Sequence, residues 1–516
     1  MASAPEETAR IFRDVLPANQ IITDSMARRL AASDISSDAD TLPSCVLRPL
    51  SEEETIGLVR AARREGVALH PRGGGWSYTG GYRPESTRSA IIETGGLQGI
   101  VTDAANGTVT VGAGETWKAL DDHLATHGKR VPSFGPLSGI GARVGATVAQ
   151  NGGFFGGASN GPVAENSVAA LTLIDGHGES HRLTSDDRHD PVVAPQPLAG
   201  DCGAFGIKTA ITLKTAPRPE NTLFASFALH TGHAVCGAIA SLKGLPGLGE
   251  VFAFDEGMHR NLAAQGFTVL EAAGIAGDLL GANASWTERL GGLLRTARAG
   301  TTHLADIPWS LHLSIDGKSS AAEDVRAEAA RRIVSFDAEA IPDVIPRVTR
   351  AKPFRAIKAL VTPLGERWLP CHGLVETSDA ATLLAALQNI LAAASGETTA
   401  HRVRAGLLIA LLGRRILIEP QFYWLDALSA YIRTMAQPDQ VRRFGDNPAN
   451  EAGRALVYRL RGALVAAMDT ANAGHFQIGR RYANHPGVPR AALDSWVELK
   501  RRFDPDRIMN PGALGL

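Results

Sequence analysis

The order of apolar and polar residues before residue 70 predicts a helix followed by a buried strand. Ser51 begins a Ser-x-x-Glu capping box, and apolar side chains then recur at helical spacing as far as Gly66, which is expected to end the helix. The apolar run 67–69 follows as a short buried strand. The first organising feature of the chain is therefore a strand that leads directly into a glycine-rich segment.

Similar patterns predict further elements along the chain. The expected strands are 90–93, 100–101, 108–111, 168–174, 207–215, 310–315 and 415–418, and the expected helices are 117–127, 320–333 and 378–395. Asn106-Gly107 lies between two of these strands and predicts a hairpin with a type I′ turn. Beyond Pro217 and Pro219, helical segments rich in Ala, Leu and Arg dominate, and this change marks a domain boundary.

Length and composition limit the class of protein. A chain of 516 residues, 44% hydrophobic and 20% charged, is expected to form two domains or lobes of a soluble enzyme. Its 52 Lys and Arg against 53 Asp and Glu give a net charge of −1, which does not favour a nucleic-acid partner. The first residues lack the apolar core of a secretory signal, and no run approaches the ~20 apolar residues of a membrane span. We therefore expect a cytoplasmic protein with no transmembrane segment.

The cysteines suggest neither a disulfide framework nor a zinc site. The four residues are Cys45, Cys202, Cys236 and Cys371, and they form no C-x-x-C pair and no zinc-type spacing with histidine. Scattered thiols of this kind are typical of packed side chains in a reducing compartment.

Residues 70–81 are the most informative segment. They read His-Pro-Arg-Gly-Gly-Gly-Trp-Ser-Tyr-Thr-Gly-Gly, with five glycines among twelve residues. Such a loop can bring its backbone close to a ligand and can turn successive N–H groups toward one anion. With Arg72 beside these donors, the segment suits the pyrophosphate of a dinucleotide. The G-x-G-x-x-G order of a Rossmann loop and the Gly-Lys-Ser/Thr order of a P-loop are both absent.

Two more glycine-rich blocks follow at intervals in the sequence. The first extends from Pro136 to Gly157, and the second is Gly203-Ala204-Phe205-Gly206-Ile207 at the start of an expected strand. One such block would be compatible with ordinary glycine-rich turns. Three blocks in this order favour a cofactor site.

The three blocks together resemble the FAD-binding domain of the vanillyl-alcohol oxidase and p-cresol methylhydroxylase family. The loop at 71–78 is similar to its P-R-G-G-G-x-S loop, 203–207 to its G-x-F-G-I strand start, and Asp504-Pro505 with Asn510-Pro511-Gly512 to its closing D-P and N-P-G. The resemblance implies FAD as the cofactor. The residues that it implies for FAD binding are Pro71, Arg72, Gly73, Gly74, Gly75, Trp76, Ser77, Tyr78, Pro136, Leu137, Ser138, Gly141, Gly145, Ala146, Val148, Gly152, Gly153, Gly203, Phe205, Gly206, Ile207 and Asn510.

Trp76 departs from the family pattern in a chemically meaningful way. Many relatives carry at this position a histidine that is linked covalently to the flavin, and tryptophan has no nitrogen suited to that bond. We therefore expect FAD to be held non-covalently, with a histidine elsewhere left open as an attachment point.

The second half of the chain resembles the FAD-linked oxidase C-terminal domain of D-lactate dehydrogenases. The similar segments are Arg367 to Gly373, Ile418 to Trp424 and His475 to Arg480. Oxidation of a carbinol requires a base near neutral pKa and, for an acid substrate, a cation that fixes the carboxylate. The candidate catalytic residues are His475 as base, Arg480 or Arg481 as clamp, and His372, Tyr423 and Tyr482 in the pocket.

No metal is expected, because the H-x-G-D-G-N-x-H and E-H-G segments that ligate zinc in some 2-hydroxyacid dehydrogenases are absent. The resemblance implies an α+β, two-lobed FAD-binding fold of the p-cresol methylhydroxylase type with an α+β substrate (cap) domain. The expected ranges are an N-terminal helical segment at 1–40, the FAD-binding domain at 41–220, the cap domain at 221–470, and a C-terminal segment at 471–516 that returns to the FAD-binding domain.

The expected function is that of an FAD-dependent oxidoreductase. Its small-molecule substrate would be a D-lactate-like 2-hydroxyacid, an aryl alcohol or a phenol, and hydride would pass from CH–OH to flavin N5. A sugar or alditol oxidase of the same fold and a non-redox flavin-fold binding protein are the alternatives. The electron acceptor (oxygen, a quinone or a cytochrome) and a homodimer are left open.

Overall fold

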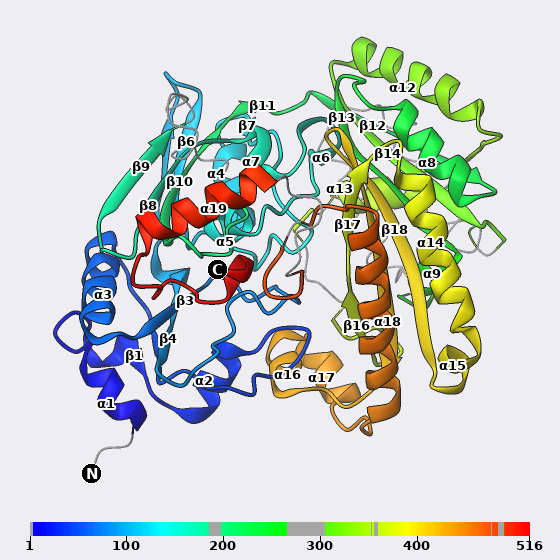
Figure 1. The fold of residues 1–516 in the computed structure, drawn as a ribbon. Helices are drawn as coiled ribbons and strands as arrows, with labels where there is room; N and C mark the ends of the chain where they lie inside the picture. Colours follow the sequence, from blue (N-terminus) through cyan, green and yellow to red (C-terminus); the bar gives the residue numbers. More distant parts are fainter. Residues whose placement is uncertain are drawn as a thin grey trace.

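The computed structural model describes residues 4–184, 198–265, 304, 306–351, 353–354, 360–475, 477–482 and 490–516. Two lobes lie side by side (Figure 1), the first built mainly from the N-terminal 217 residues and the second from the chain that follows. None of the helices in these ranges combines the length and apolar character that crossing a membrane requires.

The first lobe contains a small mixed sheet and a larger antiparallel one. Strands β2, β4 and β3 are parallel, β1 pairs antiparallel with β2, and the second sheet has the order β5-β6-β10-β8-β9. The strands of this lobe are β1 (Ile21–Ile22), β2 (Cys45–Leu47), β3 (Ala68–Arg72), β4 (Ser89–Glu93), β5 (Ile100–Asp103), β6 (Thr108–Gly112), β7 (Lys129–Arg130), β8 (Val168–Ile174), β9 (Ser180–Thr184), β10 (Ile207–Lys214) and β11 (Ala216–Pro217). Its helices are α1 (Ala4–Arg10), α2 (Ser25–Ala32), α3 (Glu52–Glu65), α4 (Trp117–Ala125), α5 (Val144–Ala149), α6 (Gly157–Asn160) and α7 (Val163–Asn166), with 3-10 turns η1 (Ala18–Gln20) and η2 (Thr94–Gly96).

The capping signals of the sequence correctly locate two helices. The Ser51 side chain accepts a hydrogen bond from the Glu54 N–H at the start of α3, and Gly66 ends that helix with a left-handed φ of 62°. Thr116 caps α4 in the same way by accepting from the Ala119 N–H. The expected strands at 90–93 and 168–174 are confirmed as β4 and β8.

The hairpin between β5 and β6 is present, but its predicted type I′ turn is wrong. Asp103 pairs with Thr108, so four residues form the loop, and of Asn106 and Gly107 only Gly107 has a positive φ. The reason is local, because the Asp103 carboxylate accepts hydrogen bonds from the Asn106 N–H and side-chain amide and so stabilises a longer turn.

The second lobe is an eight-stranded antiparallel sheet with helices on both faces. Its strands are β12 (Asn221–Leu229), β13 (Leu248–Asp255), β14 (Trp309–Gly317), β15 (Glu339–Ile341), β16 (Glu366–Pro370), β17 (Gly373–Glu376), β18 (Val403–Leu412) and β19 (Arg415–Leu425). Its helices are α8 (Gly232–Ser241), α9 (Glu256–Gln265), α12 (Ser319–Val334), α13 (Val344–Ala351), α14 (Ala380–Ala393), α15 (Ser395–Ala400), α16 (Ala430–Met435), α17 (Pro438–Phe444) and α18 (Glu451–Thr470). Helices α8, α12, α14 and α18 pack on the outer face of the sheet, and α6 of the first lobe packs on the inner face against β13 and β18 (Figure 1).

The C-terminal residues lie on the first lobe. Helix α19 (Arg490–Phe503) precedes the 3-10 turn η4 (Ala513–Gly515), and Met509 forms a parallel bridge with Leu69 of β3. The Leu69 N–H donates to the Ile508 carbonyl at 2.7 Å, and the Asn510 N–H donates to the Leu69 carbonyl at 2.8 Å. The strand that leads into the glycine loop is thus held by the end of the chain.

All four cysteines are buried and free.

A buried ion network joins the two lobes. Arg350 of α13 pairs with Glu250 of β13 and, at 2.6 Å, with Asp316 of β14, while Arg130 of β7 reaches Asp316 at 2.7 Å. Both guanidinium groups lie over the Phe134 ring, at 5.3 Å for Arg130 and 4.8 Å for Arg350. Burial raises the pKa of Asp316, but the two arginines outweigh this effect and hold the pKa below its usual value.

Replacing Arg350 with methionine leaves the buried Glu250 without its ion-pair partner and leaves Asp316 with Arg130 as its remaining partner. Removal of one partner of a buried ionic network costs about 3–5 kcal/mol, and we expect a loss of this size in the free energy of unfolding, measured by urea denaturation. The matched control is Arg326→Met, since the Arg326–Glu323 pair on α12 is exposed and should contribute under about 1 kcal/mol. Equal effects of the two substitutions would contradict this role of Arg350.

Candidate functional site

The glycine loop begins where β3 ends, and three of its carbonyl groups are held by the surrounding protein. The Tyr431 hydroxyl of α16 donates to the Gly75 carbonyl at 2.7 Å, and the Ile35 N–H donates to the Ser77 carbonyl at 2.9 Å. Arg461 of α18 donates to the Tyr78 carbonyl at 2.8 Å. Groups from the N-terminal segment and from the second lobe therefore fix the orientation of the loop.

The N–H groups of residues 73–77 in the same loop have no such partners in the described chain. In the part of the chain that the structure describes, no protein atom accepts a hydrogen bond from the N–H of Gly73, Gly74, Gly75, Trp76 or Ser77. Five successive donors in a loop that borders a cavity form a site suited to an anion.

The close packing of this loop explains why glycine is needed. A Cβ on Gly73 would lie 2.5 Å from the Ala146 Cβ, and one on Gly74 would lie 2.0 Å from the Gly141 carbonyl oxygen. Gly75 has a φ of 76°, and its Cβ would lie 2.1 Å from the Tyr431 hydroxyl. The first and second glycine blocks therefore contact each other, as their shared ligand would require.

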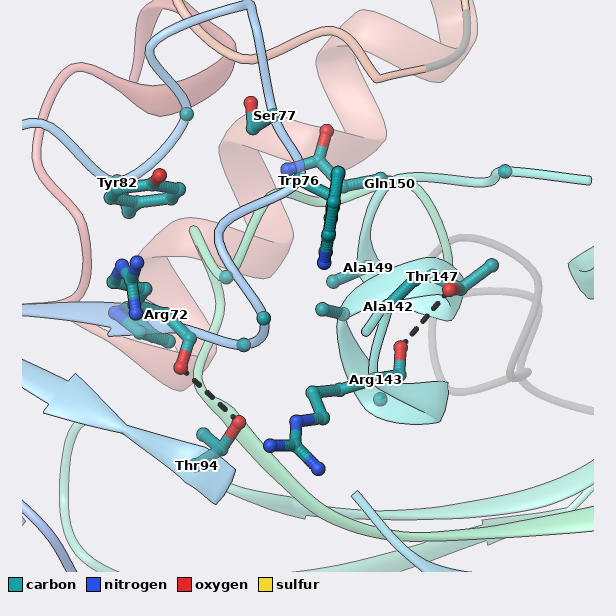
Figure 2. A pocket seen from close by; sticks show the side chains of 18 of the residues that line it. Arg72, Trp76, Ser77, Tyr82, Thr94, Ala142, Arg143, Thr147, Ala149 and Gln150 are labelled. Carbon is teal, nitrogen blue, oxygen red and sulfur yellow. Dashed lines mark hydrogen bonds between the residues drawn. The ribbon is translucent and has the colours of Figure 1, made fainter. Parts of the chain in front are cut away.

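A cavity lies against this loop (Figure 2). The lining residues that the sequence indicated are Pro71, Arg72, Gly73, Gly74, Gly75, Trp76, Ser77, Pro136, Ser138, Gly145, Ala146, Gly152, Gly203 and Gly206. All three glycine-rich blocks therefore meet at one cavity.

The remaining residues expected to bind the cofactor lie outside this wall. Val148, Phe205 and Ile207 are buried in the core behind it, whereas Leu137 is exposed. The Asn510 amide donates to the Gly81 and Cys202 carbonyls, which joins the chain end to two of the blocks. Gly141 lies beneath Trp76, since a Cβ there would be 2.1 Å from the indole Nε1. Gly141, Gly153 and Tyr78 do not line the cavity.

The lining also contains residues that sequence reasoning did not select. They are Gly81, Tyr82, Thr94, Ala113, Ala142, Arg143, Thr147, Ala149, Gln150, Cys202, Lys208 and Gln477. Arg143 could have been selected from the sequence, because it lies inside the second glycine-rich block, two residues before Gly145. Other lining residues, such as Thr94 and Lys208, reach the cavity only through the tertiary fold.

The sequence predicted that Arg72 would lie beside the pyrophosphate as its cation, but in the structure its guanidinium is paired with a carboxylate of the protein. This arginine pairs with Glu93 at 2.9 Å and donates to the Tyr431 hydroxyl, so it supports the loop. Arg143 instead donates to the Gly114 carbonyl, and its Nε has no hydrogen-bond partner among the described residues. Lys208 forms a buried pair with Asp201 at 2.5 Å. Among the described residues, Arg143 forms no ion pair with a carboxylate, whereas Arg72 and Lys208 do, and the Nε of Arg72 also has no hydrogen-bond partner there.

Three of the catalytic candidates form one buried cluster. The rings of His475 and Tyr482 stack with centroids 4.0 Å apart, and the Tyr482 hydroxyl lies 3.2 Å from His372 Nδ1. His475 Nδ1 donates to the His372 carbonyl at 2.7 Å, and its Nε2 lies 3.3 Å from Asp469. Burial lowers the pKa of His475. Both of its ring nitrogens already face protein oxygens, an arrangement suited to support rather than to proton transfer.

Arg480 lies apart from that cluster. It pairs with Glu85 at 3.2 Å and donates to the carbonyls of Gly80 and Pro511 and to the Asn510 side chain. Its donors therefore join the glycine loop to the end of the chain. Phe476, which belongs to the same motif, lies outside the described residues.

Tyr423 belongs to a second network, on the inner face of the large sheet. Its hydroxyl donates to Gln421 Oε1 at 2.6 Å, Trp368 Nε1 donates to the same oxygen at 2.9 Å, and Gln421 Nε2 donates to Glu419 Oε1 at 2.6 Å. Burial raises the pKa of Glu419 to about 7, although the Gln421 hydrogen bond offsets part of this effect. Because side chains alternate between the two faces of a strand, Leu417, Glu419 and Tyr423 of β19 lie on the same face of the sheet.

Glu419 lies in the segment from Ile418 to Trp424 that resembles the D-lactate dehydrogenases, but it was not predicted to be a catalytic residue. The signal for it was a lone carboxylate in a strand rich in apolar and aromatic residues. Tyr78 connects the two networks, because its ring packs edge-on against both Trp368 and His372, at 5.7 and 6.0 Å. Tyr78 follows Ser77, which lines the cavity, so the residue that joins the two networks is adjacent in sequence to the cavity wall.

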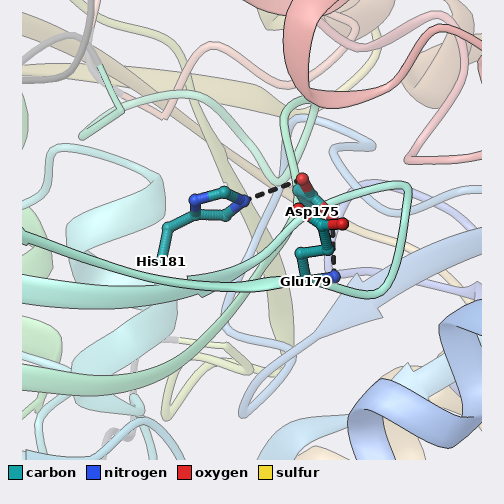
Figure 3. A group of neighbouring side chains, drawn as sticks. All are labelled: Asp175, Glu179 and His181. Carbon is teal, nitrogen blue, oxygen red and sulfur yellow. Dashed lines mark hydrogen bonds and ion pairs between the residues drawn. The ribbon is translucent and has the colours of Figure 1, made fainter.

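One group of side chains has the spacing of metal ligands, namely Asp175, Glu179 and His181 in the β8–β9 hairpin (Figure 3). Asp175 Oδ1 accepts from the N–H groups of His177 and Glu179, and Oδ2 lies 2.8 Å from His181 Nε2. The carboxylate thus stabilises the hairpin turn. The expectation that no metal is bound stays a prediction.

Comparison with known proteins indicates which cofactor this cavity would bind. Residues 43–184 match the family model described as FAD binding domain. They are an FAD-binding domain. Its two glycine-rich blocks, the third block at 203–207 and the N–H groups of residues 73–77 are the parts that would hold the cofactor.

The curated relatives match this chain over part of its length. D-lactate dehydrogenase of Archaeoglobus fulgidus is 33% identical over 109 residues, which are 21% of this chain and 24% of that protein. FAD-linked oxidoreductase tazL of Aspergillus terreus is 26% identical over 187 residues, which are 35% of this chain and 36% of that protein. The chain therefore matches well under half the length of these curated relatives.

Solved structures show that the likeness in fold extends over the whole chain. 4-Ethylphenol oxidase from Gulosibacter chungangensis superposes with a TM-score of 0.71 at 13% identity, and p-cresol methylhydroxylase with a TM-score of 0.69 at 13% identity. Both alignments cover 100% of this chain and 98% of the other. The two-lobed fold is thus of the p-cresol methylhydroxylase type, as the sequence predicted.

The geometry of the FAD-binding domain fits the cofactor. The free N–H groups of residues 73–77 suit the pyrophosphate, Arg143 supplies an adjacent cation, and the apolar part of the wall suits the rings. Trp76 stands over Ala142 and Ala149 with its indole ring turned into the cavity (Figure 2). An aromatic wall therefore replaces a nucleophile at this position.

Gly74→Ala tests whether the loop is the cofactor cradle. Because its Cβ would meet a carbonyl oxygen at 2.0 Å, the loop and the second block must separate, and we expect the purified variant to lose most of its flavin. Visible absorbance per polypeptide measures the flavin content. Gly396→Ala is the control, since nothing lies within 4 Å of its Cβ, and it should keep full flavin. Full retention in Gly74→Ala would show that the cofactor does not depend on this loop.

Proposed function

We propose that the protein is an FAD-dependent oxidoreductase that oxidises the CH–OH group of a small molecule, a 2-hydroxyacid or an aryl alcohol, by hydride transfer to flavin N5. The FAD-binding domain supports the redox part of this proposal. The names of the relatives, D-lactate dehydrogenase and L-gulono-1,4-lactone dehydrogenase, support a hydroxyl-bearing substrate.

The observation that carries the proposal is the position and state of Glu419. Its neighbours on β19, Leu417 and Tyr423, belong to an apolar cluster that also contains Phe252 and Leu408 on the inner face of the sheet. Glu419 Oε1 accepts from Gln421, and Oε2 has no hydrogen-bond partner among the described residues. A carboxyl group of pKa about 7 with one free oxygen has the properties of a general base near neutrality.

The chemistry divides between the cofactor and the protein. Bound FAD would accept the hydride, that is, the carbinol hydrogen with both electrons of its C–H bond. The Glu419 carboxylate would take the hydroxyl proton, leaving the substrate as a carbonyl compound. Gln421, held by Trp368 and Tyr423, fixes the position of Glu419, and the surrounding apolar side chains exclude water.

The first test concerns reduction of the flavin itself. Under anaerobic conditions at least one compound from a panel of 2-hydroxyacids, aryl alcohols, phenols and alditols should bleach the flavin absorbance of the wild-type protein. Bleaching by the alditol alone would identify the alternative sugar or alditol oxidase. A flavin that no member of the panel reduces would favour the non-redox binding protein. Oxygen uptake during turnover then distinguishes an oxidase from a dehydrogenase that uses a quinone or cytochrome.

The non-covalent state of FAD follows from Trp76 and has its own test. After acid precipitation, we expect the flavin of the wild-type protein to stay in the supernatant, because Trp76 offers no nitrogen suited to a bond with the ring. Yellow colour that remains in the pellet would instead identify a covalent attachment through another residue.

Glu419→Gln tests the base. Loss of a general base typically slows catalysis by about 10²- to 10⁴-fold, and we expect a fall of this size in kcat, measured by stopped-flow flavin reduction. For the wild type, the rate should rise as pH increases through about 7, because the carboxylate is the form that accepts a proton. The variant should lose this rise. The control is Glu397→Gln, an exposed residue paired with Arg459, and unchanged pH profiles in all three proteins would contradict the role of Glu419.

A further inference from the structure

A buried ion pair lies at the cavity wall beside the third glycine-rich block. Lys208, the second residue of β10, lines the cavity, and its side chain is 3% exposed. Its Nζ donates to Asp201 Oδ1 at 2.5 Å, and Asp201 is its only hydrogen-bond partner among the described residues. Because an ammonium group carries three N–H donors, two donors of Lys208 are left for a ligand.

The carboxylate of this pair is also incompletely bonded. Asp201 Oδ1 accepts from Lys208 and from the Gly203 N–H at 3.1 Å, whereas Oδ2 is buried and receives no hydrogen bond from the described residues. A buried carboxylate oxygen without a donor costs free energy, so such an atom normally has a partner. Spare donors on the ammonium and a spare acceptor on the carboxylate therefore lie within one buried pair.

The backbone is irregular on both sides of the pair. Strand β10 has a β-bulge between Lys208 and Ala210, where Thr209 is an extra residue relative to β8. Cys202 has a left-handed φ of 52°, which is uncommon for a residue other than glycine, and its N–H donates to the Ala149 carbonyl at 2.8 Å. Bulges and left-handed residues are frequent beside ligand sites, where they set the direction of side chains.

The charges at the cavity are of two kinds. Arg143 forms no ion pair with a described carboxylate, so its positive charge suits the pyrophosphate. Lys208 and Asp201 together have no net charge, and the Asp201 carboxylate would repel a phosphate oxygen. A neutral group that accepts from Nζ and donates to Oδ2 satisfies both partners, and a hydroxyl is such a group.

We propose that Lys208 and Asp201 together bind a hydroxyl group of FAD. The cofactor carries hydroxyls on its ribityl chain and on its adenosine ribose, and either set has the required chemistry. A bound hydroxyl would give Asp201 Oδ2 its missing donor and would use a second donor of Lys208. The inference concerns the cofactor and does not depend on which compound the protein oxidises.

Equilibrium dialysis of the full-length protein against FAD, FMN and ADP tests the pair. FMN carries only the ribityl hydroxyls, and ADP carries only those of the ribose. We expect Lys208→Met to weaken FAD binding by roughly 10- to 100-fold, the factor that loss of a hydrogen bond to a charged group produces. A loss of affinity for ADP but not for FMN would identify the adenosine ribose, and the reverse would identify the ribityl chain.

A second variant separates binding from folding. Lys208→Met leaves Asp201 as an unpaired buried charge and destabilises the fold, whereas the double variant with Asp201→Asn removes both charges. The double variant should also bind FAD more weakly than the wild type, because methionine offers no donor. Thermal unfolding shows which variants are folded. The matched control is Lys118→Met with Asp122→Asn, an exposed lysine–aspartate pair on α4 that should leave FAD binding unchanged.

The outcomes separate this proposal from the proposed function. Weaker FAD binding with a selective loss for ADP or FMN supports the pair even if no compound reduces the flavin, a result that would overturn the oxidation alone. Folded variants that bind FAD as tightly as the wild type would overturn the pair. Equal losses for FMN and ADP would also overturn it, because the contact would then be with a phosphate, which both probes carry.

Discussion

The structure depends on one arrangement of backbone groups, a glycine loop in which three carbonyls are bonded to protein while five successive N–H groups have no acceptor in the described chain. Tyr431, Ile35 and Arg461 bind the carbonyls of Gly75, Ser77 and Tyr78, and the N–H groups of residues 73–77 have no acceptor in the described chain. Because backbone donors are rarely left without partners, the loop is organised for a ligand that supplies several acceptor oxygens. The FAD pyrophosphate is a ligand of this kind, and the second glycine block packs closely enough to border the same cavity.

The groups that hold the loop come from both lobes, so the glycine loop is mechanically connected to the second lobe. Arg461 lies on α18 of the second lobe and contacts the loop through Tyr78, whose ring packs against Trp368 and His372. On the other side of the interface, Arg350 and Arg130 bind one aspartate from two lobes. The cavity wall and the Glu419 network are thus fixed relative to each other by buried contacts.

The sequence was sufficient for features that depend on local chemistry. Helix α3 follows from its capping box and Gly66, and the FAD-binding domain follows from three glycine-rich blocks. The type I′ turn at Asn106-Gly107 failed because the Asp103 side chain stabilises a longer loop. Residue roles in the second lobe were harder to foresee. Arg480 appeared suited to bind substrate but is engaged by Glu85 and loop carbonyls, and Glu419 acquires its raised pKa only from burial in the folded sheet.

The most direct test of the cradle is amide hydrogen exchange of residues 73–77 with and without FAD. Free N–H groups that border a cavity should exchange quickly in the flavin-free protein, and oxygen acceptors from the cofactor should slow them. The account predicts strong protection of this loop on FAD addition, with Gly107 and Gly128 in distant turns unchanged. Protection confined to other segments, with exchange of 73–77 unaltered, would contradict it.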